Sequence, residues 1–221
     1  MSHHHYSADR LSQKQLYKFL TGAIAPRPIA WISTLDPETG VSNLAPFSFF
    51  TILSSRIPLV MLSVNRRPDG TLKDTARNLL QAAKQQHTDS STRPVGVIHI
   101  VTPELLTAMN QTAATLASEH SELDLLPSDL PLLHEEKSPD AVAAAKILLN
   151  VIPFSHQLLS DSEGLPMTDV FYLEVTDFYF DETIFDAERE YILTEKLAPI
   201  ARLAGNDYSH LGPLETLRRP D

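Results

Sequence analysis

The chain has 221 residues, a formal net charge of −10, a hydrophobic content of 43% and no cysteine. This length is enough for one domain with its own core, and the composition is close to globular averages, which argues against global disorder. The absence of cysteine excludes disulfides, thiolate metal sites and a cysteine nucleophile. A strongly acidic chain is a poor candidate for general binding to nucleic acid or anionic membranes, so we expect neither as a partner.

The N-terminus carries no recognisable targeting signal. It opens Met-Ser-His-His-His without an apolar segment, and the longest uncharged run, 40–55, is too short and too polar to span a bilayer. We therefore expect a cytoplasmic protein. The histidines at 3–5 could chelate a metal, but we interpret residues 1–10 as a disordered tail and expect no metal site.

The first predicted elements are a short helix and a β-hairpin. Apolar residues at helical spacing predict a helix over 11–20, and two prolines after it exclude a helical continuation. Residues 29–35 fit a strand, 36–40 have the chemistry of a turn, and 41–45 return as the second arm of the hairpin.

An apolar, aromatic stretch follows at 47–53, and residues 58–64 predict a buried strand. A helix is expected over about 72–84, because its apolar residues share one face. Thr71 with Asp74 resembles a capping box at the start of this helix.

The second half of the chain is predicted to mix extended and helical segments. In order, we expect a polar linker at 85–94, a strand at 95–101, a helix at 102–116, a solvated acidic loop at 119–140, strands at 147–154 and 170–180, a helix at 187–201 and an irregular tail at 203–220. This order is mainly β with inserted helices. It favours a β-barrel with appended helices over a parallel βαβ sheet, which would need regular alternation.

Common nucleotide and hydrolase motifs are absent. The seven glycines include no G-x-G-x-x-G pattern and no Gly-Lys-Ser/Thr, so a Rossmann domain and a P-loop are not expected. The sequence also contains neither G-x-S-x-G nor H-E-x-x-H.

Charge is distributed unevenly along the chain. Between Arg56 and Arg77 there are five basic residues and two acids, whereas 161–190 holds ten acids and one arginine. A basic loop that leads into a helix N-terminus is a good phosphate site, because free backbone N–H groups and the helix dipole favour an anion. The alternative is a solvated loop whose arginines pair with the acidic stretch.

Five sequence blocks resemble one known family. They read TGAIAPRPIAWIST at 21–34, NLAPFSFF at 43–50, PLVMLSV at 58–64, RRPDGTLKDTARN at 66–78 and RLAGNDY at 202–208. In order and spacing they are similar to the flavin reductase-like, FMN-binding split-barrel family. The resemblance implies a single split β-barrel domain over 1–221 that dimerises and holds one FMN per subunit at or near the interface.

The resemblance also implies a set of cofactor-binding residues. Those expected along the isoalloxazine ring and the ribityl chain are Asn43, Ala45, Pro46, Phe47, Ser48 and Phe49, with Ser63 on the neighbouring strand. Those expected at the phosphate end are Lys73, Asp74 and Thr75, with Arg27 or Arg66 nearby. At least one of the aromatics at 47, 49 and 50 is expected to be ordinary core, and Trp31 is interpreted as core.

The middle of the chain departs from the family pattern. Tyr179 stands where the family carries a histidine, and we interpret His156 and His210 as surface or structural residues. No catalytic residue is assigned from the sequence.

The resemblance implies an NAD(P)H:flavin oxidoreductase that uses NADH or NADPH as electron donor. Its partners would be flavin and nicotinamide nucleotides, a second copy of the chain, and an oxygenase or another redox protein. Two alternatives stay open. One is a flavoredoxin-like electron carrier without NAD(P)H activity of its own, and the other is a non-catalytic split-barrel protein that binds another ligand.

Overall fold

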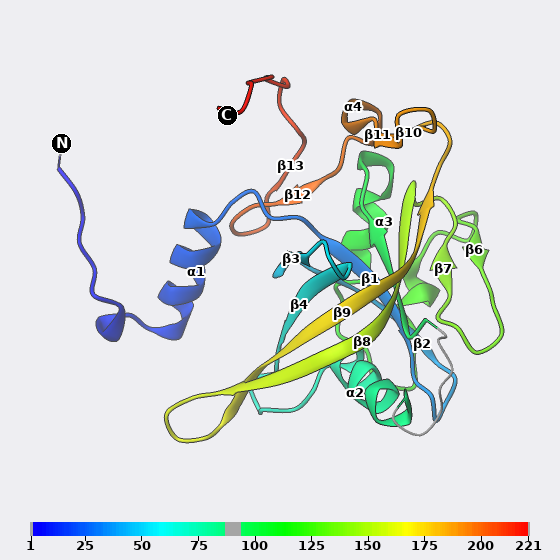
Figure 1. The fold of residues 1–221 in the computed structure, drawn as a ribbon. Helices are drawn as coiled ribbons and strands as arrows, with labels where there is room; N and C mark the ends of the chain where they lie inside the picture. Colours follow the sequence, from blue (N-terminus) through cyan, green and yellow to red (C-terminus); the bar gives the residue numbers. More distant parts are fainter. Residues whose placement is uncertain (1, 87–93, 221) are drawn as a thin grey trace.

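The computed structural model describes residues 2–86 and 94–220, and one antiparallel sheet dominates it (Figure 1). Its seven strands run in the order β2-β1-β5-β8-β9-β4-β3. Their bounds are β1 (Ala30–Leu35), β2 (Ser42–Phe47), β3 (Phe50–Ser54), β4 (Leu59–Asn65), β5 (Gly96–Ile100), β8 (Ile147–Ser160) and β9 (Pro166–Phe180). The predicted class, mainly β with inserted helices, is confirmed.

Short elements complete the fold. The helices are η1 (Ala8–Arg10), α1 (Gln13–Ala23), α2 (Asp74–Gln86), η2 (Pro103–Leu105), α3 (Leu106–Gln111), η3 (Glu122–Leu125) and α4 (Thr194–Leu197). The two-residue strands are β6 (Leu132–Leu133), β7 (Ala141–Val142), β10 (Phe185–Asp186), β11 (Tyr191–Ile192), β12 (Ala201–Arg202) and β13 (Tyr208–Ser209). Helix α1 stands apart from the sheet, whereas α2 and α3 cover it (Figure 1).

Both faces of β1 are buried, and each face belongs to a different apolar cluster. Ile32 packs with Leu62, Leu79 and Phe171 in one cluster, because alternate side chains of a strand point to the same face. Trp31 packs in the other, and its indole Nε1–H donates to the Thr112 hydroxyl over 2.8 Å. The interpretation of Trp31 as core is therefore confirmed.

Helix α2 is held to the sheet by polar bonds as well as by apolar packing. The Asn78 amide donates to the Thr34 hydroxyl over 3.1 Å, and both side chains are buried. The expected capping box is wrong, because α2 begins at Asp74 and the Thr71 hydroxyl donates to Asp69 instead.

The β8–β9 hairpin is much longer than predicted. It comprises 14 and 15 residues, and its end projects beyond the body as an arm (Figure 1). The sequence at 155–169 is polar and contains a glycine, so it has the pattern of a loop. The two strands nevertheless pair down to Ser160 and Pro166, because each supplies the backbone partners of the other.

Two helix predictions are wrong in extent or in kind. The expected helix at 187–201 contains instead β11 and the four-residue α4, and residues Glu190 and Ala198 both have positive φ. A positive φ does not fit a continuous right-handed helix. The helix expected over 102–116 ends at Gln111. The polar linker expected at 85–94 falls mostly outside the described residues.

Candidate functional site

A cavity of about 710 Å³ opens between β2, the start of α2 and the loop that follows α3. One wall is apolar and comes from β2, and a second wall is charged and comes from the loop before α2. Its lining residues are Asn43, Ala45, Pro46, Phe47, Arg66, Arg67, Pro68, Asp69, Lys73, Asp74, Thr75, Thr112, Ala113, Ala114, Thr115, Leu116 and Glu122. We call this cavity the β2–α2 pocket.

The β2–α2 pocket brings together most of the residues that the sequence predicted to bind a cofactor. Those that line it are Asn43, Ala45, Pro46, Phe47, Arg66, Lys73, Asp74 and Thr75. Arg27, Ser48, Phe49 and Ser63 are not among its lining residues. Ser63 lies on β4 beside Phe49, whose carbonyl accepts the Ser63 N–H over 2.9 Å.

Arg27 acts as a connector between three segments. Its guanidinium is buried and donates to the carbonyls of Thr21, Ile24 and Leu203 over 2.6–2.8 Å. Its Nε also approaches the Ser48 hydroxyl at 3.4 Å. Arg27 thus ties the end of α1 and the RLAGNDY block to the stretch that follows β2, and in this arrangement it holds the backbone.

The two arginines of the pocket are already paired with acids. Arg66 binds Asp169 through Nε at 2.8 Å, and Asp169 has no exposed surface. Arg67 binds Asp74 at 2.9 Å. The alternative interpretation of the basic loop, in which arginines pair with the acidic stretch, therefore holds for Arg66.

Lys73 is in a different situation. In the described part of the chain no carboxylate pairs with it, and its ammonium lies 5.6 Å from the centre of the Phe47 ring. The side chain is exposed at the rim of the pocket, yet the protein atoms crowded around its ammonium, together with the charge of Arg67, lower the pKa of Lys73. Lys73 is thus the pocket cation that is available to pair with an anionic ligand.

Thr75 has a structural contact that the sequence did not reveal. The Asn43 amide donates to the Thr75 hydroxyl over 2.8 Å, and both residues are buried. This bond fixes the start of α2 against β2. Any role of Thr75 toward a ligand is therefore combined with a role in the fold.

Glu122 is one of the pocket residues that sequence reasoning missed, because it fell in a stretch expected to be a solvated loop. It is 6% exposed, and its Oε2 accepts the Leu44 N–H at the free edge of β2 over 3.2 Å. The neighbouring Ser121 hydroxyl donates to the Ser42 carbonyl. A Ser-x-x-Asp stretch that begins a helical turn, here Ser121 to Asp124, was the available signal for local structure.

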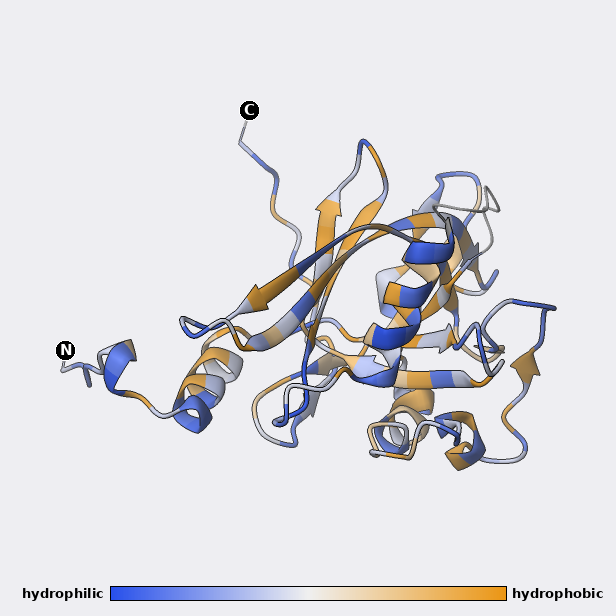
Figure 2. Cartoon of the chain, turned by 90° about the horizontal axis from the view of Figure 1, so that it is seen from below, coloured by the Kyte–Doolittle hydropathy of each residue, from blue (hydrophilic) through white to orange (hydrophobic). Residues whose placement is uncertain are grey.

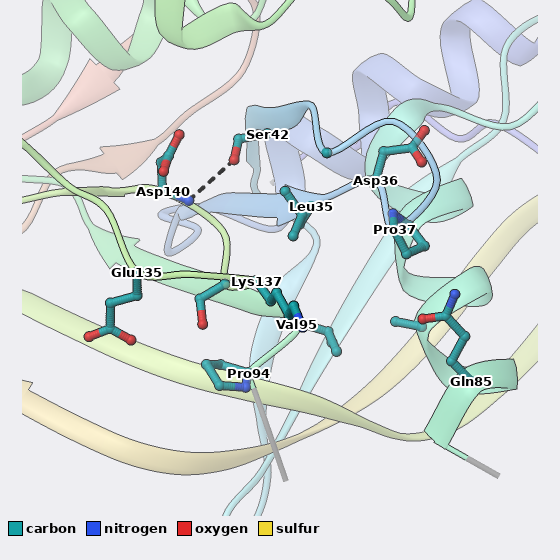
Figure 3. Close-up of a pocket in the computed structure, with 13 residues that line it drawn as sticks. Leu35, Asp36, Pro37, Ser42, Gln85, Pro94, Val95, Glu135, Lys137 and Asp140 are labelled. Carbon is teal, nitrogen blue, oxygen red and sulfur yellow. Dashed lines mark hydrogen bonds between the residues drawn. The ribbon is translucent and has the colours of Figure 1, made fainter. Parts of the chain in front are cut away.

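A second cavity, of about 630 Å³, lies beside the turn at 36–40 (Figure 3). The Asp140 N–H donates to the Ser42 hydroxyl across it, over 3.3 Å. Three carboxylates line this cavity, from Asp36, Glu135 and Asp140, against the single cation of Lys137. This charge makes it a poorer place for a phosphate than the β2–α2 pocket.

Comparison with known proteins identifies the family to which the chain belongs. The family model described as "flavin reductase like domain" matches residues 22–193, which include every predicted site residue. The chain belongs to the flavin reductase-like family. The chain is 37% identical to YwrF from Bacillus subtilis, a protein described as uncharacterised, over 97% of this chain and 98% of YwrF.

Solved structures place the fold of this flavin reductase-like protein among split barrels. Component B of nitrilotriacetate monooxygenase from Bacillus cereus superposes with a TM-score of 0.85 and 32% identity, over 98% of this chain and all of that one. A Shewanella frigidimarina protein described with a split barrel domain has a TM-score of 0.72 and 16% identity, over 99% of this chain and all of that one. The predicted split barrel is confirmed.

The residues of the β2–α2 pocket fit a flavin mononucleotide chemically. The Ala45–Phe47 wall is apolar, as an aromatic ring requires, and Lys73 beside the start of the 13-residue helix α2 suits a phosphate. In the described ranges 2–86 and 94–220, no group of three histidine or acidic side chains forms a metal site. Over the same ranges, no helix is long and apolar enough to cross a membrane.

Proposed function

We propose that this protein is an FMN-binding oxidoreductase that accepts hydride from NADH or NADPH. The observation that carries the proposal is the combination, in one cavity, of the apolar Ala45–Phe47 wall with the unpaired cation of Lys73 at the start of α2. Its family membership and its 32% identity to a monooxygenase component support the oxidoreductase class. The absence of cysteine supports a cytoplasmic setting.

The residues of the chain would bind and orient the cofactor. When bound, the flavin supplies the hydride-accepting chemistry, so the chain needs little acid–base machinery of its own. Ala45, Pro46 and Phe47 give a surface for the ring, and the backbone of 45–49 with Ser48 is expected to contact it. Lys73 and the first N–H groups of α2 hold the phosphate, and Asn43 with Thr75 keeps the two walls in register.

A spectrum of the purified protein, followed by NADH or NADPH addition under nitrogen, tests this function. We expect flavin absorbance that bleaches when the nicotinamide nucleotide is added. A protein that binds FMN but is reduced only by another redox protein would instead be a flavoredoxin-like carrier. A protein that binds no flavin would be the non-catalytic ligand-binding alternative.

Lys73→Ala is expected to weaken FMN binding about tenfold and leave riboflavin binding nearly unchanged. A charge-assisted hydrogen bond contributes about 1.5–3 kcal/mol, and the exposure of Lys73 favours the low end. Riboflavin is the control ligand, because it keeps the ring and the ribityl chain but lacks the phosphate. Fluorescence titration of both flavins measures the effect.

Thr75 provides the comparison for Lys73. Because the Thr75 hydroxyl accepts the buried Asn43 bond, Thr75→Ala should weaken both flavins and lower the melting temperature. Thr75→Ser keeps the hydroxyl and should retain both properties. Equal losses of FMN and riboflavin in Lys73→Ala would contradict the phosphate assignment.

We also propose that the protein is a homodimer. Large apolar side chains are exposed on α1, directly after it and on β3, including Leu20 at 57%, Ile24 at 62% and Ile52 at 78%. Figure 2 shows apolar segments along α1 although this helix stands apart from the sheet. Strand β3 is also an edge of the sheet, and edges and large apolar patches are usually covered.

Light scattering is expected to give twice the mass of one chain. The double variant Leu20→Asp, Ile52→Asp should shift the protein toward one-chain mass, because it places charges on both apolar surfaces. Leu217→Asp is the matched control: that side chain is 85% exposed in the C-terminal tail, and its change should leave the mass unaltered. A flavin-bound monomer at working concentration would disprove the dimer.

A further inference from the structure

The β2–α2 pocket has as many acidic as basic lining residues, which is unfavourable for the binding of an anion. Its lining cations are Arg66, Arg67 and Lys73, and its lining acids are Asp69, Asp74 and Glu122. Behind the lining, a fourth acid, the fully buried Asp169, pairs with Arg66, and a fourth cation, Arg77, pairs with Asp74. With every group ionised, the pocket has no surplus of positive charge to offer a phosphate that carries nearly two negative charges.

Three of these acids accept hydrogen bonds from neighbouring side chains. Asp169 accepts from Arg66 and from His156, and Asp74 accepts from Arg67 and from Arg77.

Asp69 accepts from the Thr71 hydroxyl and the Thr71 N–H. These bonds lower the pKa of Asp69, and its carboxylate is exposed to solvent. Protonation of Asp69 would weaken these bonds.

Glu122 has the opposite environment. It is 6% exposed, and its carboxylate accepts a hydrogen bond from the Leu44 N–H on β2. Burial raises the pKa of Glu122 and outweighs the backbone N–H groups of Glu122 and Leu44, which act against it. The negative charge of Asp74 on α2 adds to the rise, and Arg67 opposes it.

The other groups that line the pocket around Glu122 are Asp69 and Lys73 before α2 and the hydroxyls of Thr112 and Thr115 after α3. On its own turn, Asp124 is exposed. Among the lining acids in the described ranges, Glu122 is therefore the buried one whose carboxylate pairs with no cation.

Resting on the FMN-binding function proposed above, we propose that Glu122 takes up a proton from solvent when a flavin phosphate enters this pocket. Oε2 keeps the Leu44 N–H bond in both states, so the new O–H forms on Oε1. The proton removes one negative charge beside the incoming anion. Binding of FMN is thereby linked to proton uptake, whereas riboflavin, which brings no charge, takes up none.

Calorimetric titration in two buffers of different ionisation enthalpy, from pH 5.5 to 7.5, measures the protons bound per flavin. We expect the wild-type protein to take up more protons with FMN than Glu122→Gln does, by about half a proton where the difference is largest. With riboflavin the two proteins should agree. Glutamine keeps an oxygen for the Leu44 N–H and carries no charge, so the fold should survive.

The affinities supply a second readout. At pH 7.5, Glu122→Gln should bind FMN about five- to tenfold more tightly than wild type, because a like charge is removed, and this advantage should vanish as the pH falls. Asp69→Asn is the matched control: it neutralises an acid of the same pocket that stays ionised, so the proton number should remain that of wild type.

Infrared difference spectra of protein labelled with ¹³C-glutamate keep the test independent of the variant. Addition of FMN to wild type should produce the isotope-shifted carbonyl stretch of a protonated glutamate. Identical proton numbers in wild type and Glu122→Gln, or no such band, would overturn the inference while FMN still binds. A wild-type protein that binds neither flavin would overturn the proposed function instead.

Discussion

Asp169→Ala is expected to lower the free energy of unfolding by about 3–5 kcal/mol, because it leaves the mostly buried Arg66 guanidinium without its carboxylate partner. Asp169 is fully buried and accepts from Arg66 Nε at 2.8 Å and from His156 Nε2 at 2.9 Å. Arg66 is itself 16% exposed, so water cannot replace the lost carboxylate fully. Urea denaturation measures the loss.

Asp186→Ala is the matched control for this prediction. Asp186 also pairs with an arginine, Arg189, but at 3.8 Å and with the arginine 83% exposed. A surface pair of this kind contributes about 0–1 kcal/mol. Similar losses in the two variants would show that the burial of Asp169 does not set the strength of its contacts.

Substitution of Asp169 also affects the β2–α2 pocket. Arg66 lines the β2–α2 pocket, and Asp169 on β9 holds its guanidinium from behind. Asp169→Asn keeps the shape and one acceptor, so we expect a smaller loss of stability than in Asp169→Ala. It also removes a negative charge near the pocket, and FMN binding should not weaken beyond what the loss of folded protein explains.

Acidification from pH 6.5 to 4 is expected to remove up to about 3 kcal/mol of stability through His99 alone. Burial lowers the pKa of His99 to about 4. Its Nε2 accepts the Val142 N–H over 3.0 Å, and its Nδ1 lies 2.7 Å from the Trp31 carbonyl, to which the neutral ring donates. Below pH 6.5 the unfolded chain binds a proton at this histidine, whereas the native ring stays neutral. The free energy of unfolding therefore falls as the pH falls toward 4.

His99→Gln tests this assignment. The variant should be less stable than wild type at pH 7.5, and the difference between the two should shrink as the pH falls to 4. Taking the difference cancels the contribution of Glu122, whose raised pKa acts with the opposite sign. A constant difference across this pH range would show that His99 does not titrate as its burial requires. Chemical denaturation at each pH provides the measurement.

Local sequence patterns were sufficient for the elements whose signals lie close together in the chain. The turn at 36–40 and its two strands follow from proline and glycine chemistry and from runs of β-forming residues, and β1 and β2 pair as expected. Helix α2 follows from one apolar face, through Ala76 and Leu79. The motif blocks likewise placed eight predicted site residues around one pocket.

Contacts between distant residues decided the rest. Arg66 and Asp169 are 103 residues apart, and only the pairing of β4 with β9 shows that this arginine is already neutralised. The sequence places Glu122 in an acidic loop, and only the structure shows that it accepts the Leu44 N–H at the edge of β2. The arm of β8 and β9 has a loop-like sequence, yet each strand satisfies the other's backbone.

The sequence by itself determined the family, the mainly β class and eight of the residues that line the pocket, because these depend on residue types at short, ordered spacings. The tertiary structure alone decided which charges in the pocket are free. Within the described residues, Lys73 and Glu122 have no oppositely charged partner, whereas Arg66 and Arg67 are each paired with an acid. The physical reason is that pairing and burial set the energy of a charge, and both depend on neighbours brought from elsewhere in the chain.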